Sequence, residues 1–444
     1  LLYRLLWVEV LLGLVGGCSA LLLHYVHAQG GELLPALVGV SLAIGLLSGF
    51  ELPLVLRLVE TPQELDRRVS LVLSADYVGG LGAALAFPLL LLPELGAIQA
   101  AFALGLLNLT VVWVVIFRFD LEISPGRSVA LASAAATSLL LVGLACSDEL
   151  QSWVESKAHP GRSIVSHQTR YQRLLLARGR ADLRLYINGN LQFSSRDEHR
   201  YHEALVHPAM LAAARRERVL ILGGGDGLAA REVLAYPEVR TVHLVDLDPA
   251  MLALFRDDPA LAALNEKSLD DPRLTATARD AMAYLEDTPW RYDVIVVDLP
   301  DPNSLDLGKL YSRRFYALAS RCLRSGGALV IQSTSPWYAP DAYWCIVSTV
   351  ESASRPERPL SVHPYWVTVP TFGGDWGFTL ALAAGAQLPL GQPPVRTRFL
   401  TAEVLAGLFA FPRDTKRQET AINRLDDQAL VRYYWAAQDG QRGR

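Results

Sequence analysis

Two aspartates at the end of one apolar run are the clearest candidates for a chemical role. In VIVVDLPDPN (294–303), Asp298 stands at the tip of the run and Asp301 follows just before Pro302. An uncharged run of this length predicts a buried strand of a parallel sheet, and ligands bind beyond the carboxyl ends of such strands. We therefore predict that Asp298 faces a ligand. For Asp301, an ordinary turn or cap is an equal alternative.

A second chemical signal is the glycine-rich turn LILGGGDG (220–227), which contains Gly223, Gly225 and Gly227. Glycines between a strand and a helix let the backbone approach a bound nucleotide closely. The dinucleotide fingerprint G-x-G-x-x-G would need glycine where Leu228 stands, which disfavours a nicotinamide enzyme. This turn also carries an acid, Asp226, inside it.

Further aspartates are predicted at the same edge of the sheet. Asp246 ends the next strand, where it can hold ribose hydroxyls, and Asp280, in the sequence RDA, follows a third strand, where it can face an adenine amino group. With Asp226, Asp298 and Asp301 they place several carboxylates around one crevice. Crowded carboxylates raise one another's pKa unless cations neutralise them. We interpret the crevice as a site for a nucleoside and a polycation.

The elements that must position these acids begin near residue 163. Alternating segments around Asn188-Gly189 predict a β-hairpin, and RDEHRYHEALVHPAM (196–210) predicts a helix. Strand-like and helix-like segments then alternate, which predicts a doubly wound parallel α/β sheet. The predicted domains are a transmembrane domain at 1–147, a linker and hairpin subdomain at 148–200, the main α/β domain at 201–390 and a helical extension at 391–444.

The first 147 residues have a different character. Apolar stretches at 5–24, 33–56, 70–92, 97–117 and 128–146 approach or exceed the roughly 18–20 residues that cross a bilayer. We predict an all-α, multi-pass transmembrane domain. Acids inside such spans are costly and therefore functional candidates. Glu9 and Glu51 have the simpler alternative of reaching the interface, whereas Asp76, beside a predicted glycine-rich packing face, is a candidate polyamine or proton site.

The bulk composition excludes several other classes. A net charge of -4 provides no basic footprint for nucleic acid. The four cysteines are scattered, without the spacing of a disulfide framework or a zinc site. Because the chain starts with Leu-Leu-Tyr, we expect the natural N-terminus to lie upstream.

Seven motifs, in order and at matching spacing, resemble the spermidine synthases. They are YQ (171–172), NGNLQ (188–192), DEHRYHE (197–203), GGGDG (223–227), VDLD (245–248), RDA (279–281) and DLPDP (298–302). The likeness covers about residues 160–380, and the apolar half resembles that of the bacterial membrane-bound form. It implies an α/β Rossmann-like fold of the S-adenosylmethionine-dependent methyltransferase type. It also implies transfer of an aminopropyl group from decarboxylated S-adenosylmethionine to putrescine, which gives spermidine and methylthioadenosine.

The resemblance also implies a role for each matching residue. Asp298 would accept the proton of the acceptor amine. The amine and the aminopropyl group would contact Tyr201, His202, Asp226 and Asp301. The nucleoside would be held by Gln172, Gln192, Gly223, Gly225, Asp246, Asp280 and Ala281. No metal or other cofactor is expected, because the sulfonium is already an activated leaving group, and a homo-oligomer is expected.

This sequence departs from the family pattern at two places. Leu299-Pro300 stands where Ser or Thr often follows the first aspartate, and Ala281 stands where glycine is frequent. The acceptor therefore stays open among putrescine, cadaverine, agmatine and spermidine. Three other functions also stay open: an amine N-methyltransferase, a membrane polyamine transporter or sensor with a synthase-like binding domain, and synthesis coupled to export through the membrane half.

The substrates predict where the soluble part lies. We expect a multi-pass protein of the inner cell membrane with its catalytic domain in the cytoplasm. The charges of the short loops conflict with this, because placing Arg4 and the arginines near 57–68 and 118–127 inside puts the C-terminal part outside after five crossings. The conflict disappears if the stretch 128–146 lies in the interface.

Overall fold

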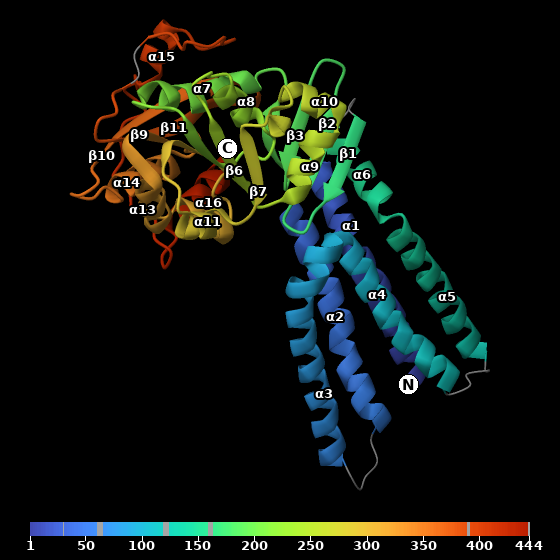
Figure 1. Ribbon diagram of the computed structural model, residues 1–444. Coiled ribbons are helices and arrows are strands. Elements are labelled where there is room, and N and C mark those ends of the chain that lie inside the picture. The colour runs from blue at the N-terminus through green and yellow to red at the C-terminus, as the bar shows by residue number, and fades with distance from the viewer. Residues whose placement is uncertain (30, 60–64, 119–123, 159–162, 389–390, 443–444) are drawn as a thin grey trace. The chain divides into compact units, whose positions relative to one another are not determined.

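The chain folds into two compact units, Leu1–Arg180 and Ala181–Arg444 (Figure 1). The computed structural model describes residues 1–444 except 30, 60–64, 119–123, 159–162, 389–390 and 443–444. The predicted boundary at residue 390 lies outside the described residues, and the other predicted domain boundaries remain predictions.

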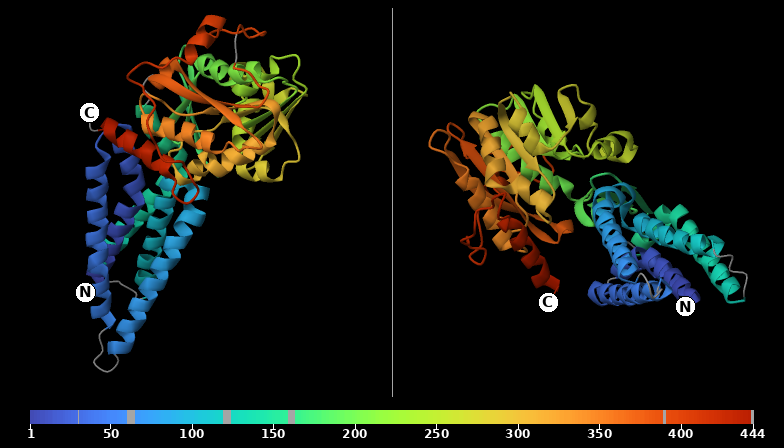
Figure 2. Two further views of the ribbon diagram at one scale, coloured as in Figure 1. Left: turned by 90° about the vertical axis from the view of Figure 1, so that its left-hand side faces the viewer. Right: turned by 90° about the horizontal axis from the view of Figure 1, so that it is seen from below.

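Long helices make up most of the first unit (Figures 1 and 2). They are α1 (Leu2–Ala28), α2 (Leu33–Val59), α3 (Leu65–Ala86), a π-helical turn (Phe87–Leu91), α4 (Leu92–Arg118), α5 (Ser124–Ala145) and α6 (Ser147–Ala158). A hairpin of β1 (Ser163–Gln168) and β2 (Arg173–Arg178) follows, with the strands antiparallel.

Within the described residues, four helical segments are long and apolar enough to cross a bilayer. They are Leu2–Ala28, Leu33–Leu58, Val69–Arg118 and Arg127–Ala145. The third is 50 residues long and holds two of the five predicted stretches. Its backbone leaves the helical region at Gly96 (φ 74°, ψ 174°), so that α3 and α4 are separate rods in Figure 1. The loop predicted there is therefore a tight break inside one helical segment.

Helices α1 and α4 approach each other closely through glycine. A Cβ atom on Gly105 would lie 2.5 Å from the carbonyl oxygen of Gly13 and 2.9 Å from the Cα atom of Gly17. Small residues of this kind let two helix backbones come into contact. The adjacent Glu9 is buried, and Asn108 Nδ2 donates to its carbonyl oxygen at 2.7 Å. Glu9 is thus buried inside the helix bundle, and its position relative to the membrane interface stays a prediction.

Among the described residues, nothing packs on the glycine-rich face predicted beside Asp76. Asp76 is exposed, and no described atom lies within 4 Å of the position of a Cβ on Gly79, Gly80 or Gly82. Glycine spacing alone does not say whether a partner helix is present, and here the neighbouring helices pack elsewhere.

The second unit begins with the predicted hairpin. Strands β3 (Leu183–Ile187) and β4 (Asn190–Ser194) pair antiparallel. The two residues between them have positive φ angles, 51° at Asn188 and 84° at Gly189. This is the geometry of a type I′ turn, which Asn-Gly favours because both residues tolerate positive φ. The predicted turn is confirmed.

A seven-stranded sheet forms the centre of the second unit, in the order β10-β11-β9-β8-β5-β6-β7. The strands are β5 (Arg218–Gly223), β6 (Thr241–Asp246), β7 (Leu274–Ala278), β8 (Tyr292–Asp298), β9 (Leu323–Gln332), β10 (Leu360–Val369) and β11 (Gly374–Ala383). The α/β class is confirmed, but the sheet is mixed and not wholly parallel: β5 to β9 run parallel, whereas β11 pairs antiparallel with β9 and β10. The connection from β10 to β11 is too short for the crossover that parallel strands need.

Helices cover both faces of this sheet (Figure 1). The helices of this unit are α7 (Glu198–Ala212), α8 (Leu228–Leu234), α9 (Pro249–Asp257), α10 (Pro259–Leu264), α11 (Ala281–Asp287), α12 (Leu305–Gly308), α13 (Arg313–Cys322), α14 (Pro340–Ser352), α15 (Ala402–Leu408) and α16 (Ala429–Arg442), with short 3-10 turns at Ser268–Asp270, Lys309–Tyr311 and Pro370–Phe372. Leu222 and Val297 of the sheet share a core with Phe315, Ile346 and Leu430 of three helices. The C-terminal helix α16, red in Figure 2, thus packs with α14 into the main domain.

Candidate active site

The carboxyl ends of the parallel strands meet at one edge, where the glycine-rich turn lies against the end of β8. In the strand register, Gly223 is opposite Asp298, and Gly224 N donates to Asp298 O at 3.0 Å. Gly223 has φ 82°, and a Cβ atom there would lie 2.0 Å from the same carbonyl oxygen. Only glycine fits at this crossing, so the turn delivers Asp226 next to the end of β8.

Three side chains converge at this point, and we name them the carboxylate cluster: His202, Asp226 and Asp298. Each offers an atom within 4.8 Å of the others. Among the described residues this is the set that could hold a metal ion, and the same donors could equally hold an ammonium group. The two acids, Asp226 of the glycine turn and Asp298 of β8, therefore offer the anionic oxygens for a cation beside His202 of α7.

Asp226 is almost fully buried, with 8% of its surface exposed. Its Oδ1 accepts from Leu228 N at 2.9 Å, at the start of α8. Burial raises its pKa to about 6; His202 opposes this and Asp298 adds to it. A carboxylate held this way is readily stabilised by a bound cation.

Asp298 is held by a phenol. Tyr201 Oη donates to Asp298 Oδ1 at 2.7 Å. Burial raises the pKa of Asp298, while His202 and the Tyr201 hydroxyl lower it. A partly buried carboxylate with a raised pKa, one oxygen of which is fixed by a neutral donor, is suited to accept a proton from a bound group.

Two acids of the motif DEHRYHE of 197–203 tie α7 to two segments further along the chain. Asp197 accepts from the Thr371 backbone N–H at 2.8 Å and from its hydroxyl at 2.6 Å. Glu203 accepts three backbone N–H bonds, of 2.7–2.9 Å, from residues 398–400. These buried acids explain why the motif is polar on a helix that lies inside the domain.

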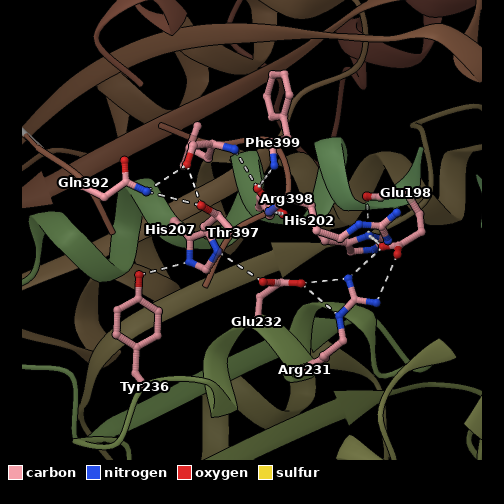
Figure 3. A network of polar contacts seen from close by, with 12 residues as sticks. Glu198, His202, His207, Arg231, Glu232, Tyr236, Gln392, Thr397, Arg398 and Phe399 are labelled. Atoms are coloured by element: carbon pink, nitrogen blue, oxygen red, sulfur yellow. Dashed lines mark hydrogen bonds and ion pairs between the residues drawn. The ribbon is translucent and has the colours of Figure 1, made fainter. Parts of the chain in front are cut away.

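Glu198 bonds to His202 and favours the protonated form of its imidazole (Figure 3). Its Oε2 is 2.9 Å from His202 Nδ1 and 2.9 Å from Arg231 Nη2. Burial alone would lower the pKa of His202, but the bond to Glu198 raises it to about 9. Burial would raise the pKa of Glu198, but His202 and Arg231 together lower it to about 2. His202 is therefore an imidazolium at neutral pH, within 4.8 Å of an oxygen of Asp226 and of Asp298.

The network continues away from the cluster. Arg231 also contacts Glu232 Oε1 at 2.8 Å, and Glu232 Oε2 is 3.2 Å from His207 Nε2. His207 Nδ1 and Tyr236 Oη lie 3.0 Å apart (Figure 3). These side chains join α7, which carries His202, to α8, which follows the glycine turn.

Asp301 is neither a helix cap nor a simple turn former. Tyr434 Oη donates to its Oδ2 at 2.8 Å, and Gln332 Nε2 donates to its Oδ1 at 3.2 Å. Trp376 Nε1 in turn donates to Gln332 Oε1 at 3.2 Å. Burial raises the pKa of Asp301, and the donors Tyr434, Gln332 and Thr334 lower it. Asp301 is thus not the ordinary turn residue of the alternative prediction. Its carboxylate is held by side chains on two sides.

Aromatic rings gather around the Tyr201 ring. The rings of Phe378 and Phe372 have centroids 5.3 and 5.8 Å from it, and Trp376 lies 6.5 Å away. Phe372 and Trp376 are 4.7 Å apart in an edge-to-face arrangement. Such rings attract cations through their faces and exclude water from a nearby carboxylate.

The predicted nucleoside acids end the neighbouring strands. Asp246 Oδ2 accepts from Gly225 N at 3.0 Å and Oδ1 accepts from Asp248 N at 2.9 Å, while burial raises the pKa of Asp246 to about 6. Asp280 Oδ1 accepts from Ala283 N at the start of α11, and its Oδ2 is 3.4 Å from Lys309 Nζ. Ala281, the first residue of α11, is buried.

Two of the residues predicted to bind the nucleoside, Gln172 and Gln192, have no described contact with the residues of the crevice. Gln192 lies on β4, where its Nε2 donates to Asn190 O at 3.2 Å in the same hairpin. Gln172 belongs to the first unit. Both stay predictions.

Four contributors to the site were not predicted from the sequence: Glu198, Gln332, Trp376 and Tyr434. Glu198 lies within a motif that was recognised, and its spacing of four residues from His202 on a helix is a usable signal. The other three come from β9, β11 and α16, and nothing in their local sequence indicates that they reach Asp301.

Comparisons with known proteins agree on one family. Residues 198–387 match the model of the spermine/spermidine synthase domain. Polyamine aminopropyltransferase 2 of Ralstonia nicotianae is 44% identical over 444 residues, which cover 98% of this chain and 85% of the relative. Polyamine aminopropyltransferase of Leptospira interrogans is 40% identical, covering 98% and 86%. The crystal structure of a spermidine synthase with the transition state analogue AdoDATO shares the fold, with a TM-score of 0.53, 24% identity and coverage of 57% of this chain and 87% of that one.

The chain belongs to the polyamine aminopropyltransferase family. The predicted family and the predicted class of enzyme, a transferase, are confirmed.

Proposed function

We propose that this enzyme transfers the aminopropyl group of decarboxylated S-adenosylmethionine to putrescine and produces spermidine and methylthioadenosine. Family membership supports the reaction class. The single observation that carries the chemistry is the carboxylate cluster, in which Asp298, fixed by Tyr201 at 2.7 Å, adjoins the nucleoside turn and its buried Asp226.

The acceptor must first lose a proton. A primary ammonium has a pKa near ~10 and no free electron pair at neutral pH. Asp298 accepts that proton as the nitrogen begins its attack. The nitrogen electron pair forms a C–N bond to the methylene carbon beside the sulfonium, and the C–S bond breaks with its electrons on sulfur. The leaving group is a neutral thioether, so the step requires no metal.

The remaining acids orient the two substrates. Asp226 holds the ammonium of the aminopropyl group, and its place inside the nucleoside turn supports this role. Asp246 holds the ribose hydroxyls, Asp280 and Ala281 contact the adenine, and Gly223 and Gly225 allow the backbone to approach. Gln192 completes the nucleoside side within the second unit, and the role of Gln172 rests on the family resemblance alone. Tyr201, His202 and Asp301 line the acceptor side.

The test is a pair of incubations of the full-length enzyme with putrescine. Decarboxylated S-adenosylmethionine is expected to yield spermidine and methylthioadenosine in equal amounts, whereas intact S-adenosylmethionine yields no product. Methylated putrescine from the intact nucleoside, without spermidine from the other, would identify an amine N-methyltransferase. Ligand binding without turnover would identify a transporter or sensor. Parallel incubations with cadaverine, agmatine and spermidine identify the preferred acceptor.

We also propose that the first unit is a multi-pass domain of the inner cell membrane and that the catalytic unit lies in the cytoplasm as a homo-oligomer. The long apolar helices and the largely exposed apolar side chains of α2 and α3 support the membrane placement. Protease treatment of inside-out vesicles is expected to cleave the catalytic unit, and cleavage only in right-side-out vesicles would reverse the orientation. Spermidine released inside sealed inside-out vesicles would favour coupled export.

A further inference from the structure

The C-terminal extension is seated firmly on the domain that carries the site. Glu203 of α7 accepts the backbone N–H groups of residues 398–400. Further along, Asn423 is fully buried, and its Nδ2 donates to Gly308 O at 2.9 Å and to Tyr311 O at 3.1 Å. Leu430 of α16 belongs to the main core. The start of α16 is therefore held in one place relative to β8.

From this position α16 contacts the segment after β8 at two points. Tyr434 Oη donates to Asp301 Oδ2 at 2.8 Å, and Trp435 Nε1 donates to Asn303 O at 2.9 Å. Tyr434 is only 9% exposed. Its hydroxyl thus lies inside the domain, directed at a carboxylate beside the proposed acceptor site.

The bonding of Asp301 leaves it able to hold a ligand as well. Each carboxylate oxygen has two acceptor positions. The donors from Tyr434 and Gln332 occupy one on each oxygen, and Thr334 is a third donor, so that one of the four positions stays open. All three donors are neutral, so they fix the direction of the carboxylate without cancelling its charge. Asp298 has a different arrangement, because Tyr201 bonds to its Oδ1 and its Oδ2 lies near the glycine turn, 3.2 Å from the position of a Cβ on Gly224.

We propose that Tyr434 is a positioning residue for the acceptor: by fixing Asp301 from the C-terminal helix, it sets the affinity of the enzyme for the diamine. This inference rests on the proposed function. Asp298 then accepts the proton of the reacting nitrogen. Asp301 binds the other ammonium of the diamine, which does not react. The region matched by the family model ends at residue 387, so the acceptor side is completed by a segment beyond it.

The test is the substitution Tyr434→Phe, which removes one hydroxyl. A hydrogen bond to a charged group is worth enough that the KM for putrescine is expected to rise about tenfold. Because the reacting groups are untouched, kcat is expected to change by less than about threefold and the KM for the nucleoside by less than about twofold. The matched control is Tyr433→Phe. Tyr433 lies next to Tyr434 on α16, and its hydroxyl accepts from Ala421 N at 3.3 Å. This control is expected to leave kcat and both KM values unchanged.

Two results would overturn this assignment. One is an unchanged KM for putrescine in Tyr434→Phe. The other is an equal loss in the kinetic constants of both substrates with a lowered Tm, which would mean that the hydroxyl only supports the fold. A wild-type enzyme that forms no spermidine would instead remove the proposed function and this inference with it, so the two failures are distinguishable.

Discussion

The nucleoside side and the acceptor side of the site are built in different ways. On the nucleoside side, Asp246 is fixed by two backbone N–H groups, that of Asp248 two residues further on and that of Gly225 in the glycine turn, 21 residues earlier. On the acceptor side, Asp298 and Asp301 are fixed by the side chains of Tyr201, Gln332 and Tyr434, which lie 97, 31 and 133 residues away from their partners. The first half is encoded by short contiguous motifs, and the second only by the completed fold.

The largest effect is expected from Asp298→Asn, which tests whether the acceptor side carries the chemistry. Loss of the proton acceptor is expected to lower kcat by at least about a thousandfold. The nucleoside side is unaffected, so calorimetric affinity for methylthioadenosine should stay within about twofold of the wild type. Retained turnover would show that another group takes the proton.

Acid pH should weaken binding on the nucleoside side. The pKa values of Asp226 and Asp246 are both raised by burial to about 6. Both must be ionised to hold their partners, so the kcat/KM for the nucleoside is retained above pH 6 and falls below it. With two such groups the fall approaches about a hundredfold per pH unit. A profile that stays flat down to pH 5 would contradict these roles.

The substitution Asp246→Asn is expected to have a moderate effect on one substrate only. Loss of the charged acceptor for ribose hydroxyls should raise the KM for the nucleoside about 30-fold. The KM for putrescine at saturating nucleoside should not change. A suitable control is Asp270→Asn, an exposed acid paired with Arg256 at 3.1 Å, which should leave both constants as they are. Equal changes in both constants would mean that the two halves are coupled.

A smaller effect is expected from Trp376→Phe. This change removes the donor to Gln332 and should raise the KM for putrescine by about threefold, the value of one neutral hydrogen bond. The control is Trp366→Phe on the neighbouring strand β10, whose Nε1 donates to Ala410 O at 2.9 Å. If both variants behave alike, the link from Trp376 to Asp301 has no function.

No effect is expected from metal removal. Although the carboxylate cluster has donors that could hold a metal ion, the proposed donor is a sulfonium that releases a neutral thioether and needs no electrophile. Dialysis of the enzyme against EDTA should therefore leave kcat unchanged. Lost activity that zinc or magnesium restores would assign the cluster to a metal.

The same contrast explains what the sequence can predict. The turn at Asn188-Gly189, the glycine turn with Asp226 and the strand end at Asp298 are local patterns whose backbone requirements are readable from a few residues. The antiparallel β10 and β11 were not foreseen, because β propensity does not specify direction. Asp301 was ambiguous because its environment comes from β9 and α16. The break at Gly96 was expected as a loop, since composition does not distinguish a kink from a short connection.

The bond between Tyr434 and Asp301 also has a consequence for biosynthesis. A ribosome adds about 5–20 residues per second, and 133 residues separate the two partners. Roughly 10 s therefore pass between synthesis of the carboxylate and synthesis of its phenol partner. During that interval the nascent chain already has every residue of the nucleoside crevice. The acceptor side still lacks Tyr434 of the C-terminal helix. We expect the growing polypeptide to gain affinity for the nucleoside before it gains affinity for the diamine.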